Sequence, residues 1–249
     1  MTLNLVKVPV WSAQLMAIAQ RRGMPMRRID SGYLVHTFLR EVWQDMAPAP
    51  FHFEDGRPRT IDVWGYTDAT AEQLVTHARN VGDPEWLSVL AAPELAFGRA
   101  VPEIGAGTRV DFRTRFCPVV RTRSDQNASG EREIDAWLAA CIEKGLPEDG
   151  GREVVDREVV YRSWLRARLE RAGLEAQSMV GRRFHMESLL RRNHTPARDV
   201  RILRRPDAEF EVTAVVQDAA LFNDALRRGF GRHRAFGFGM IRLLRIEAC

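Results

Sequence analysis

Two Gly-x-Gly pairs close to the end of the chain constrain its fold more than any other feature. The pairs are Gly229-Phe-Gly231 and Gly237-Phe-Gly239, and they enclose the cationic residues Arg232, His233 and Arg234. Glycine lets a backbone turn tightly and approach a ligand closely, and arginine matches the charge and geometry of a phosphate group. Glycines that only form a turn are the alternative, and the clustered cations argue against it. The stretch predicts a loop that binds a phosphate-bearing ligand.

The elements on either side of this loop argue against the common nucleotide-binding folds. Residues 218–228 have the apolar spacing of a helix, and residues 240–246 form an apolar run typical of a strand. In dinucleotide-binding and P-loop folds, the glycine motif follows a strand and opens a helix. Because the order here is the reverse, we expect neither fold.

The composition is typical of a soluble globular protein. Of the 249 residues, 45% are hydrophobic and 28% are charged. No apolar run approaches the roughly 20 residues that a membrane helix needs, and the first residues lack the profile of a signal peptide. The three cysteines, Cys117, Cys141 and Cys249, lack the paired spacing of a zinc site. We therefore expect a reduced, cytoplasmic setting, with no membrane partner, no metal and no cofactor.

Positive charge is concentrated in the second half of the chain. The formal net charge is +4, and every lysine or arginine position except Lys7 and Lys144 is an arginine. A GC-rich genome would also favour arginine, so position is more informative than number. Arginines gather in residues 152–205 and 227–245. This distribution indicates that the partner is an acidic polymer, and it favours a nucleic acid over a membrane surface.

The two halves of the chain predict the same order of elements: strand, helix, two strands, helix, strand. In the first half we expect strands at 3–10, 51–53, 60–66 and 86–97, and helices at 13–21, 31–46 (with Asp30 as N-cap) and 71–80. In the second half we expect strands at 108–117, 200–204, 209–216 and 240–246, helices at 131–144, 156–172 and 218–228, and a helical or irregular basic stretch at 178–192.

This repeated order predicts an α+β fold of two tandem ferredoxin-like (RRM-like) domains. The expected domains are residues 1–104 and 105–249, and the second carries an arginine-rich helical insertion at about 124–198. An open sheet face in such a domain offers a platform for RNA.

Three further motifs precede the glycine loop along the chain. They are Tyr33-Leu-Val-His36, Asp111-Phe-Arg-Thr-Arg-Phe-Cys-Pro118, and a helix that starts Tyr161-Arg-Ser-Trp164 and ends at Gly173. Together with the loop, they resemble the signature of CRISPR repeat-processing endoribonucleases of the CasE type. Two positions differ from the family pattern, because Asp111 replaces an arginine and Glu41 stands where lysine is frequent.

The resemblance implies two ferredoxin-like domains and metal-independent cleavage of the CRISPR repeat at the base of its hairpin. The implied partners are the repeat hairpin, the processed guide RNA and other subunits of an interference complex. In the related type IV (Csf-type) branch, arginines can replace histidine in catalysis. A non-catalytic or arginine-assisted guide-RNA-binding subunit is therefore the alternative function, and a small-molecule enzyme with the same double fold is a third.

Tyr33, His36 and Arg40 are the candidate catalytic residues. In metal-independent cleavage, the 2′-hydroxyl of the RNA attacks the adjacent phosphorus while acid–base groups move the protons. Histidine titrates near neutral pH, and Tyr33 lies three residues earlier on the same helical face. Arg40 and Arg234 could stabilise the developing negative charge. His233 is the rival imidazole, and an ordinary helix residue is the alternative interpretation of His36.

A wider set of glycines and basic residues is predicted to bind RNA. It comprises Gly229, Gly231, Arg232, His233, Arg234, Gly237, Gly239, Arg242, Arg113, Arg115, Arg162, Arg166, Arg168, Arg171, Arg182 and Arg183. For the arginines of the 156–172 helix, a solvated face paired with Glu158 and Glu170 is the alternative. No carboxylate–histidine cluster in the sequence indicates a metal site.

Overall fold

The computed structural model describes residues 2–24, 31–56, 58–91, 97–123, 131–146, 154–192 and 200–247. The first half of the chain forms β1 (Asn4–Trp11), α1 (Ser12–Arg21), α2 (Ser31–Trp43), η2 (Gln44–Met46), β2 (Phe51–Asp55), β3 (Thr60–Thr67), α3 (Ala71–Val81), α4 (Pro84–Leu87) and β4 (Phe97–Ala100). The second half forms β5 (Arg109–Phe116), β6 (Val119–Arg123), β7 (Glu131–Asp135), α5 (Ala136–Glu143), α6 (Arg157–Arg171), β8 (Leu174–Arg192), β9 (Val200–Val216), α7 (Ala219–Arg228), η4 (Arg234–Phe236) and β10 (Arg242–Glu247).

Each half of the chain builds one four-stranded antiparallel sheet with the same relative strand order. The first sheet has the order β2-β3-β1-β4 and the second has the order β10-β5-β9-β8. In both, the last strand of the unit lies beside the first, and the third lies between the first and the second. This arrangement confirms the prediction of two tandem ferredoxin-like domains. The strands β6 and β7 pair only with each other and form a separate ribbon.

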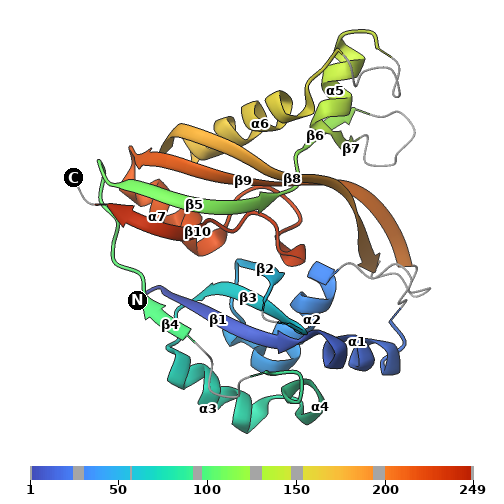
Figure 1. The fold of residues 1–249 in the computed structure, drawn as a ribbon, viewed down its shortest axis with the longest axis vertical. Helices are drawn as coiled ribbons and strands as arrows, with labels where there is room; N and C mark the ends of the chain where they lie inside the picture. Colours follow the sequence, from blue (N-terminus) through green and yellow to red (C-terminus); the bar gives the residue numbers. More distant parts are fainter. Residues whose placement is uncertain are drawn as a thin grey trace.

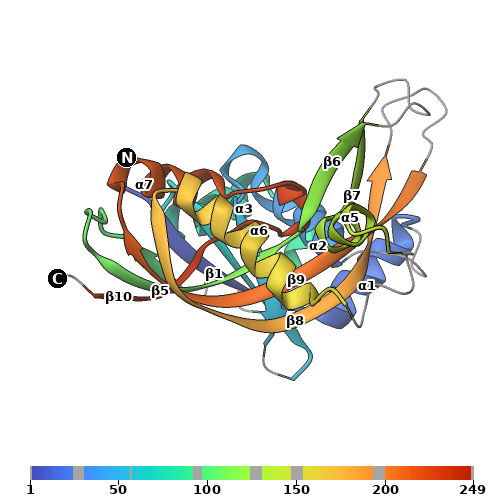
Figure 2. The ribbon, with the colours of Figure 1, turned by 90° about the horizontal axis from the view of Figure 1, so that it is seen from above.

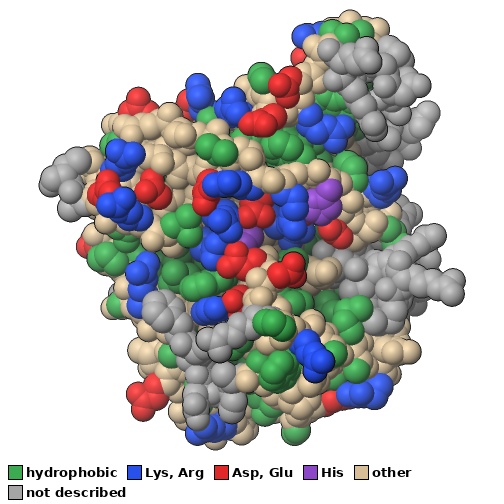
Figure 3. All heavy atoms as spheres, in the orientation of Figure 1, with side chains coloured by type: hydrophobic (Ala, Val, Ile, Leu, Met, Phe, Trp, Pro, Cys, Tyr) green, Lys and Arg blue, Asp and Glu red, His purple; other side chains and the backbone are tan. Residues whose placement is uncertain are grey.

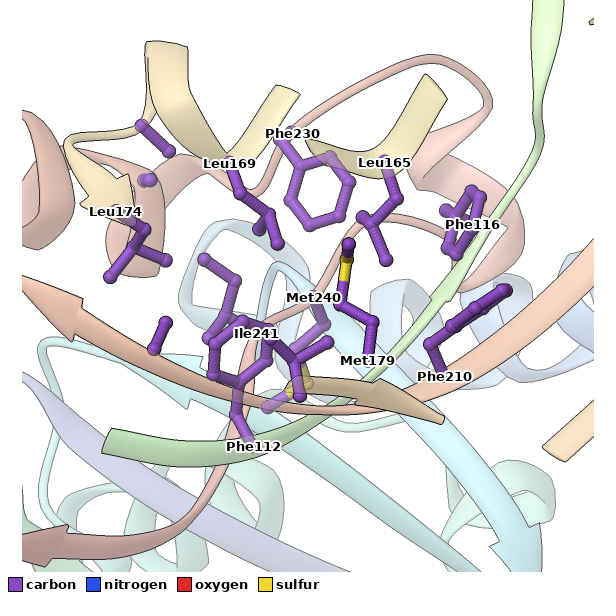
Figure 4. Packing of buried hydrophobic residues seen from close by; sticks show 14 of the residues in the cluster. Phe112, Phe116, Leu165, Leu169, Leu174, Met179, Phe210, Phe230, Met240 and Ile241 are labelled. Carbon is purple, nitrogen blue, oxygen red and sulfur yellow. The ribbon is translucent and has the colours of Figure 1, made fainter. Parts of the chain in front are cut away.

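Helices cover one face of each sheet because their apolar side chains recur with helical spacing. In α2, the buried side chains include Leu34, Phe38 and Val42, which pack in the core of the first half. In the second half, α6 and α7 cover the sheet, and Phe230 inserts beneath them (Figure 4). Side-chain caps start several of these helices: Thr70 caps α3, Asp156 caps α6 and Asp218 caps α7.

The sheet faces that carry no helix lie between the two halves, one sheet above the other in Figure 1. Leu5 and Tyr66 of the first sheet belong to the same apolar cluster as Ile241 and Leu243 of the second half. The hydroxyl of Tyr66 donates to the carbonyl of Ile241 over 2.8 Å. The two sheets therefore partly cover each other, and the open sheet platform that we expected for RNA is not present as a single free surface.

The residues that we expected to extend the helical insertion form strands instead. Residues 178–192 belong to β8, which pairs with β9 along its length. The two strands expected at 200–204 and 209–216 are one strand, β9, which continues through Pro206. The basic pattern of β8 reflects carboxylates on the strand opposite, a long-range partner that local periodicity does not reveal. Within the described part of the insertion, α5 and α6 are helical as predicted.

Smaller differences occur at three other segments. The helix expected at 131–144 starts only at Ala136, because β7 precedes it. Of the strand expected at 86–97, the start lies in α4, Leu90 forms an isolated bridge with Val10 of β1, and β4 begins at Phe97. The N-cap expected at Asp30 lies outside the described residues. The domain boundary expected at residues 104 and 105 falls between β4 and β5 and stays a prediction. None of the described helices is long and apolar enough to cross a membrane.

His52 should make the stability of the protein depend on pH. Its imidazole is buried between the sheets, and neither ring nitrogen has a hydrogen-bond partner among the described residues. Burial, followed by the charges of Arg242 and Arg115, lowers the pKa of His52 well below its ordinary value. Below the ordinary pKa of about 6.5, the unfolded chain therefore binds a proton that the folded protein excludes, and stability falls.

We expect the free energy of unfolding to decrease as the pH falls from about 6.5, by at most about 1.4 kcal/mol per pH unit from this one group. His52→Leu should flatten this dependence in urea unfolding measured between pH 7.5 and 5. Burial also lowers the pKa values of His36 and His233, so a residual slope remains. An unchanged slope in the variant would contradict the assignment.

Candidate active site and nucleic-acid interface

The helix α2 and the glycine loop, defined as residues 229–239, meet in direct contact. A Cβ atom on Gly32 would lie 2.1 Å from the carbonyl oxygen of Phe236, so a side chain cannot fit there. The ring of Tyr33 lies 6.3 Å from the ring of Phe236, centroid to centroid. Two predicted site elements that are about 200 residues apart in the sequence are thus neighbours in the fold.

His36 is a half-buried imidazole on the same helix. It stacks on Phe51 of β2, with ring centroids 6.4 Å apart and planes inclined by 14°. Burial, assisted by the charge of Arg40, lowers the pKa of His36. The ring is therefore neutral at pH 7 and is able to accept a proton. Arg40 is exposed, and its Nη2 lies 3.4 Å from Oδ1 of the exposed Asp45, which is a weak pair in solvent.

The backbone of the glycine loop requires its glycines. Gly229, Gly231, Gly237 and Gly239 all have positive φ, between 67° and 81°. At Gly239, a Cβ atom would lie 1.9 Å from the carbonyl oxygen of Phe230. The amide of Phe230 donates to the carbonyl of Gly239 over 2.9 Å, which closes the base of the loop. The glycines therefore have a structural role, whatever ligand the loop binds.

Arg115 lies inside the protein and cannot contact RNA as we expected, since only 2% of its side chain is exposed. Its Nε and Nη2 donate to Oδ2 of the fully buried Asp207 over 2.9 and 2.7 Å. Its Nη1 donates to the carbonyl of Phe236 over 3.3 Å, and its guanidinium lies over the rings of Phe53 and Phe238. Arg115 thus fixes the glycine loop against both sheets.

The other arginines of this face are also paired with carboxylates. Arg242 is largely buried and donates to both oxygens of Glu54 over 2.8 and 3.1 Å. Arg113 pairs with Glu54 and with Glu211, and Arg182 pairs with Glu211. Arg183 lies 3.8 Å from Glu209. We name this set the inter-sheet ion-pair cluster; the basic and acidic side chains intermingle on this side of the molecule in Figure 3.

The basic residues of α6 lie on the opposite face of the second sheet. The apolar side of α6 packs on the core with Phe112 and Phe116, whereas Arg113 points away from that core. Arg162 pairs with Glu158, as the solvated-helix alternative predicts. Among the described residues, no carboxylate lies within ion-pair distance of Arg166, Arg168 or Arg171. The structure thus divides the predicted RNA-binding arginines between two faces.

A shallow groove connects α6 with the glycine loop. It has a volume of about 410 Å³ and is lined by Val119, Val120, Arg121, Trp164, Arg168, Gly231 and Arg232. The guanidinium of Arg168 lies over the ring of Trp164 at 4.5 Å. Burial and the nearby Arg171 lower the pKa of Arg168, but a guanidinium remains charged at any physiological pH. We name this the α6 groove.

Sequence reasoning missed Glu133 of β7, which contacts three cationic side chains. It accepts hydrogen bonds from Arg232, from His233 over 3.0 Å and from Arg205 over 3.4 Å. Burial opposes its ionisation, but His233 and Arg232 outweigh that effect and lower the pKa of Glu133. Arg234 is exposed and donates to the carbonyl of Arg228 over 2.7 Å. No local pattern could have identified Glu133, since its partners lie about 70 to 100 residues away.

The fold brings together one histidine–carboxylate group that the sequence did not reveal. His185 Nε2 lies 3.0 Å from Glu187 and 3.2 Å from Asp207, because β8 and β9 pair in this register. The three residues offer ligand atoms within 4.8 Å of one another. However, Arg115 donates twice to the same oxygen of Asp207, so a cation already balances that carboxylate. The donor set does not favour a metal ion.

Comparisons with known proteins match almost the whole chain. A family model described as CRISPR associated protein matches residues 11–245. No curated protein sequence matches. The structure of Thermus thermophilus Cse3, bound to an RNA representing a pre-cleavage complex, has a TM-score of 0.60 at 16% identity, covering 98% of this chain and 100% of that one.

Two further solved structures share this fold. Cas6e from Escherichia coli K-12 has a TM-score of 0.54 at 16% identity, covering 96% of this chain and 98% of that one. A chain of a CRISPR RNA-guided surveillance complex has a TM-score of 0.54 at 17% identity, with coverage of 96% and 98%.

Gly32→Ala tests the contact between α2 and the glycine loop. At an ordinary position inside a helix, this change stabilises a protein by up to about 1 kcal/mol. Here we expect destabilisation by roughly 1–3 kcal/mol, because the new methyl group overlaps the Phe236 carbonyl. Ser31→Ala, at the exposed neighbouring position, is the control. Urea unfolding measures both, and a stabilised Gly32→Ala variant would show that the contact is absent.

Proposed function

Because this chain belongs to the CRISPR-associated protein family, we propose that it is a metal-independent endoribonuclease that cleaves CRISPR repeat hairpins in precursor transcripts. It would retain the mature guide RNA and deliver it to an interference complex. One observation carries the proposal: the helix with Tyr33 and His36 packs directly on the cationic glycine loop. The same fold in an RNA-bound endoribonuclease, Cse3, and in a chain of a surveillance complex supports it.

The proposed chemistry needs a proton acceptor, a proton donor and a charge stabiliser. The neutral His36 takes the proton of the 2′-hydroxyl as that oxygen forms a bond to the adjacent phosphorus. The bond from phosphorus to the 5′-oxygen breaks, and the leaving oxygen receives a proton from Tyr33 or from the imidazolium. The products are a 2′,3′-cyclic phosphate and a 5′-hydroxyl. Arg40 and Arg234, both exposed, neutralise charge on the phosphorane.

We infer that RNA lies on the α6 side of the second sheet and not between the sheets. The arginines between the sheets are neutralised by protein carboxylates, whereas Arg166, Arg168 and Arg171 have no such partner among the described residues. The α6 groove leads from these arginines to the glycine loop. An A-form stem that follows this path presents its backbone to the arginines, which read shape and charge.

His36→Ala distinguishes the nuclease from a guide-RNA-binding subunit that does not cut. The repeat RNA of the source genome is incubated with the protein in EDTA, and the product ends are analysed. We expect His36→Ala to reduce cleavage by at least about 100-fold and to change hairpin affinity by less than about twofold. His77→Gln, a histidine change on α3, is the matched control. In the wild type, the rate should be lost only as the pH falls below about 6.5, since His36 acts in its neutral form.

Unchanged cleavage by His36→Ala would move catalysis to arginines, as in the type IV-like alternative. Binding without any cleavage by the wild type would support the non-catalytic subunit. A protein that neither binds nor cuts the repeat RNA would overturn the proposal.

Charge removal on the two faces tests where RNA binds. Arg166 and Arg171 are changed together to alanine, and the control changes Arg182 and Arg183, so both proteins lose two positive charges. Affinity falls as salt rises, and we expect this dependence to become shallower. The magnitude of the slope of log affinity against log salt should decrease by about 1.5 in the α6 variant and by less than about 0.5 in the control. Fluorescence anisotropy with a labelled repeat hairpin gives both slopes. Equal changes would place RNA on both faces.

A further inference from the structure

Three cationic or hydrogen-donating side chains from two separate elements converge on the carboxylate of Glu133. Arg232 and His233 come from the glycine loop, and Arg205 comes from β9. The Glu133 side chain is only 20% exposed. Among the described residues, no other carboxylate pairs with Arg232 or His233. Two loop residues that we propose as RNA ligands are therefore already bound to an anion of the protein itself.

The chemistry of this cluster matches an RNA phosphate. Guanidinium groups bind carboxylate and phosphate oxygens with the same N–H···O⁻ geometry. Arg232 also lines the α6 groove, where the RNA backbone is proposed to run. His233 adopts a left-handed backbone conformation, with φ of 60°, and its imidazole lies 3.0 Å from Glu133. The cluster thus has the donors and the position of a phosphate-binding site, and a carboxylate fills it.

The element that carries Glu133 belongs to neither four-stranded sheet. The strands β6 and β7 form their own two-stranded ribbon, which projects with α5 from the body of the second half (Figures 1 and 2). Apart from Glu133, the ribbon is joined to α6 where Trp164 donates to the Val119 carbonyl and Tyr161 donates to Asp135. Because α5 is part of the apolar core, RNA displaces Glu133 by rotation of its own side chain, and the ribbon stays in place.

We propose that Arg205, Arg232 and His233 form a binding site for one backbone phosphate of the RNA, and that Glu133 occupies this site as a phosphate mimic until RNA displaces it. The inference rests on the proposed function, because it takes RNA as the ligand. In this proposal Glu133 competes with the RNA phosphate for the three donor side chains. An RNA that makes few other contacts with the protein does not displace Glu133, whereas a correctly shaped hairpin does. The carboxylate therefore lowers affinity for all RNA and favours ligands that engage the whole surface.

Glu133→Gln tests the competition with a gain of affinity, which misfolding does not produce. The variant keeps the size of the side chain and removes its charge. Binding of a labelled repeat hairpin is measured in the His36→Ala background, so that no RNA is cut. We expect Glu133→Gln to bind about three- to fivefold more tightly, the value of one weak ion pair released. Glu133→Ala, which removes the charge and also the polar end of the side chain that glutamine keeps, should likewise increase the affinity for the hairpin.

Glu54→Gln is the matched control. It too removes one negative charge from a carboxylate bound by two arginines, Arg113 and Arg242, but on the inter-sheet face. We expect its affinity for the hairpin to stay within about 1.5-fold of the parent. If Glu54→Gln tightens binding as much as Glu133→Gln does, the effect is only that of net charge and the phosphate-mimic assignment is wrong.

A double-mutant cycle with Arg232→Ala shows whether Glu133 competes with RNA for Arg232 or orients Arg232 to bind RNA. If Glu133 competes with phosphate, Arg232→Ala weakens RNA binding more in the Glu133→Gln protein than in the parent, because the arginine is then free to bind RNA. If Glu133 instead orients Arg232 for RNA, Glu133→Gln weakens binding and the cost of Arg232→Ala becomes smaller. The second pattern overturns the inference.

The two proposals fail in different ways. A wild-type protein that binds and cuts the hairpin, together with a Glu133→Gln variant of equal or lower affinity than its His36→Ala parent, rejects the phosphate mimic and leaves the nuclease intact. A wild-type protein that does not bind the hairpin rejects the nuclease. Thermal unfolding of each variant confirms that the proteins compared are folded.

Discussion

The buried ion pair of Arg115 and Asp207 fixes the geometry on which the rest of the site depends. Arg115 belongs to the second sheet, and its guanidinium lies over the ring of Phe53 in the first sheet. The same guanidinium donates to the Phe236 carbonyl, against which α2 packs. A lone charge left in such a place would be strongly destabilising, by about 3–5 kcal/mol, so neither partner can be lost alone. The same carbonyl of Phe236 thus contacts Arg115 of the second sheet and Gly32 of the helix that carries Tyr33 and His36.

The second sheet separates two kinds of arginine. Between the sheets, arginines alternate with carboxylates and hold the halves of the protein together. On the helix side, Arg166, Arg168 and Arg171 of α6 have no carboxylate partner among the described residues. A count of positive charges treats the two kinds alike, although only the second kind offers a net attractive field to an anionic polymer. The pairing of charges, and not their number, identifies the proposed interface.

Local patterns in the sequence were sufficient for the fold class and for the elements that carry the candidate site. The apolar spacing of α2, the alternation of β5 and the order of helix, glycine loop and strand are all present as predicted. Three features could not be found in this way. Residues 178–192 form a strand because β9 lies beside them, Arg115 is buried because Phe53 and Phe238 enclose it, and Glu133 matters through partners far along the chain. Each of these features depends on tertiary contacts between residues that are far apart in the sequence, and a short stretch of sequence does not contain them.

The contact between Gly32 and Phe236 joins a helix near the start of the chain to a loop near its end. On a ribosome, α2 is made before the glycine loop, so the contact between them forms only after the loop has left the exit tunnel. By then all of β1 to β4, on which α2 packs, has already been synthesised. The junction between α2 and the loop is therefore a late event in folding, added to a first half that is already complete.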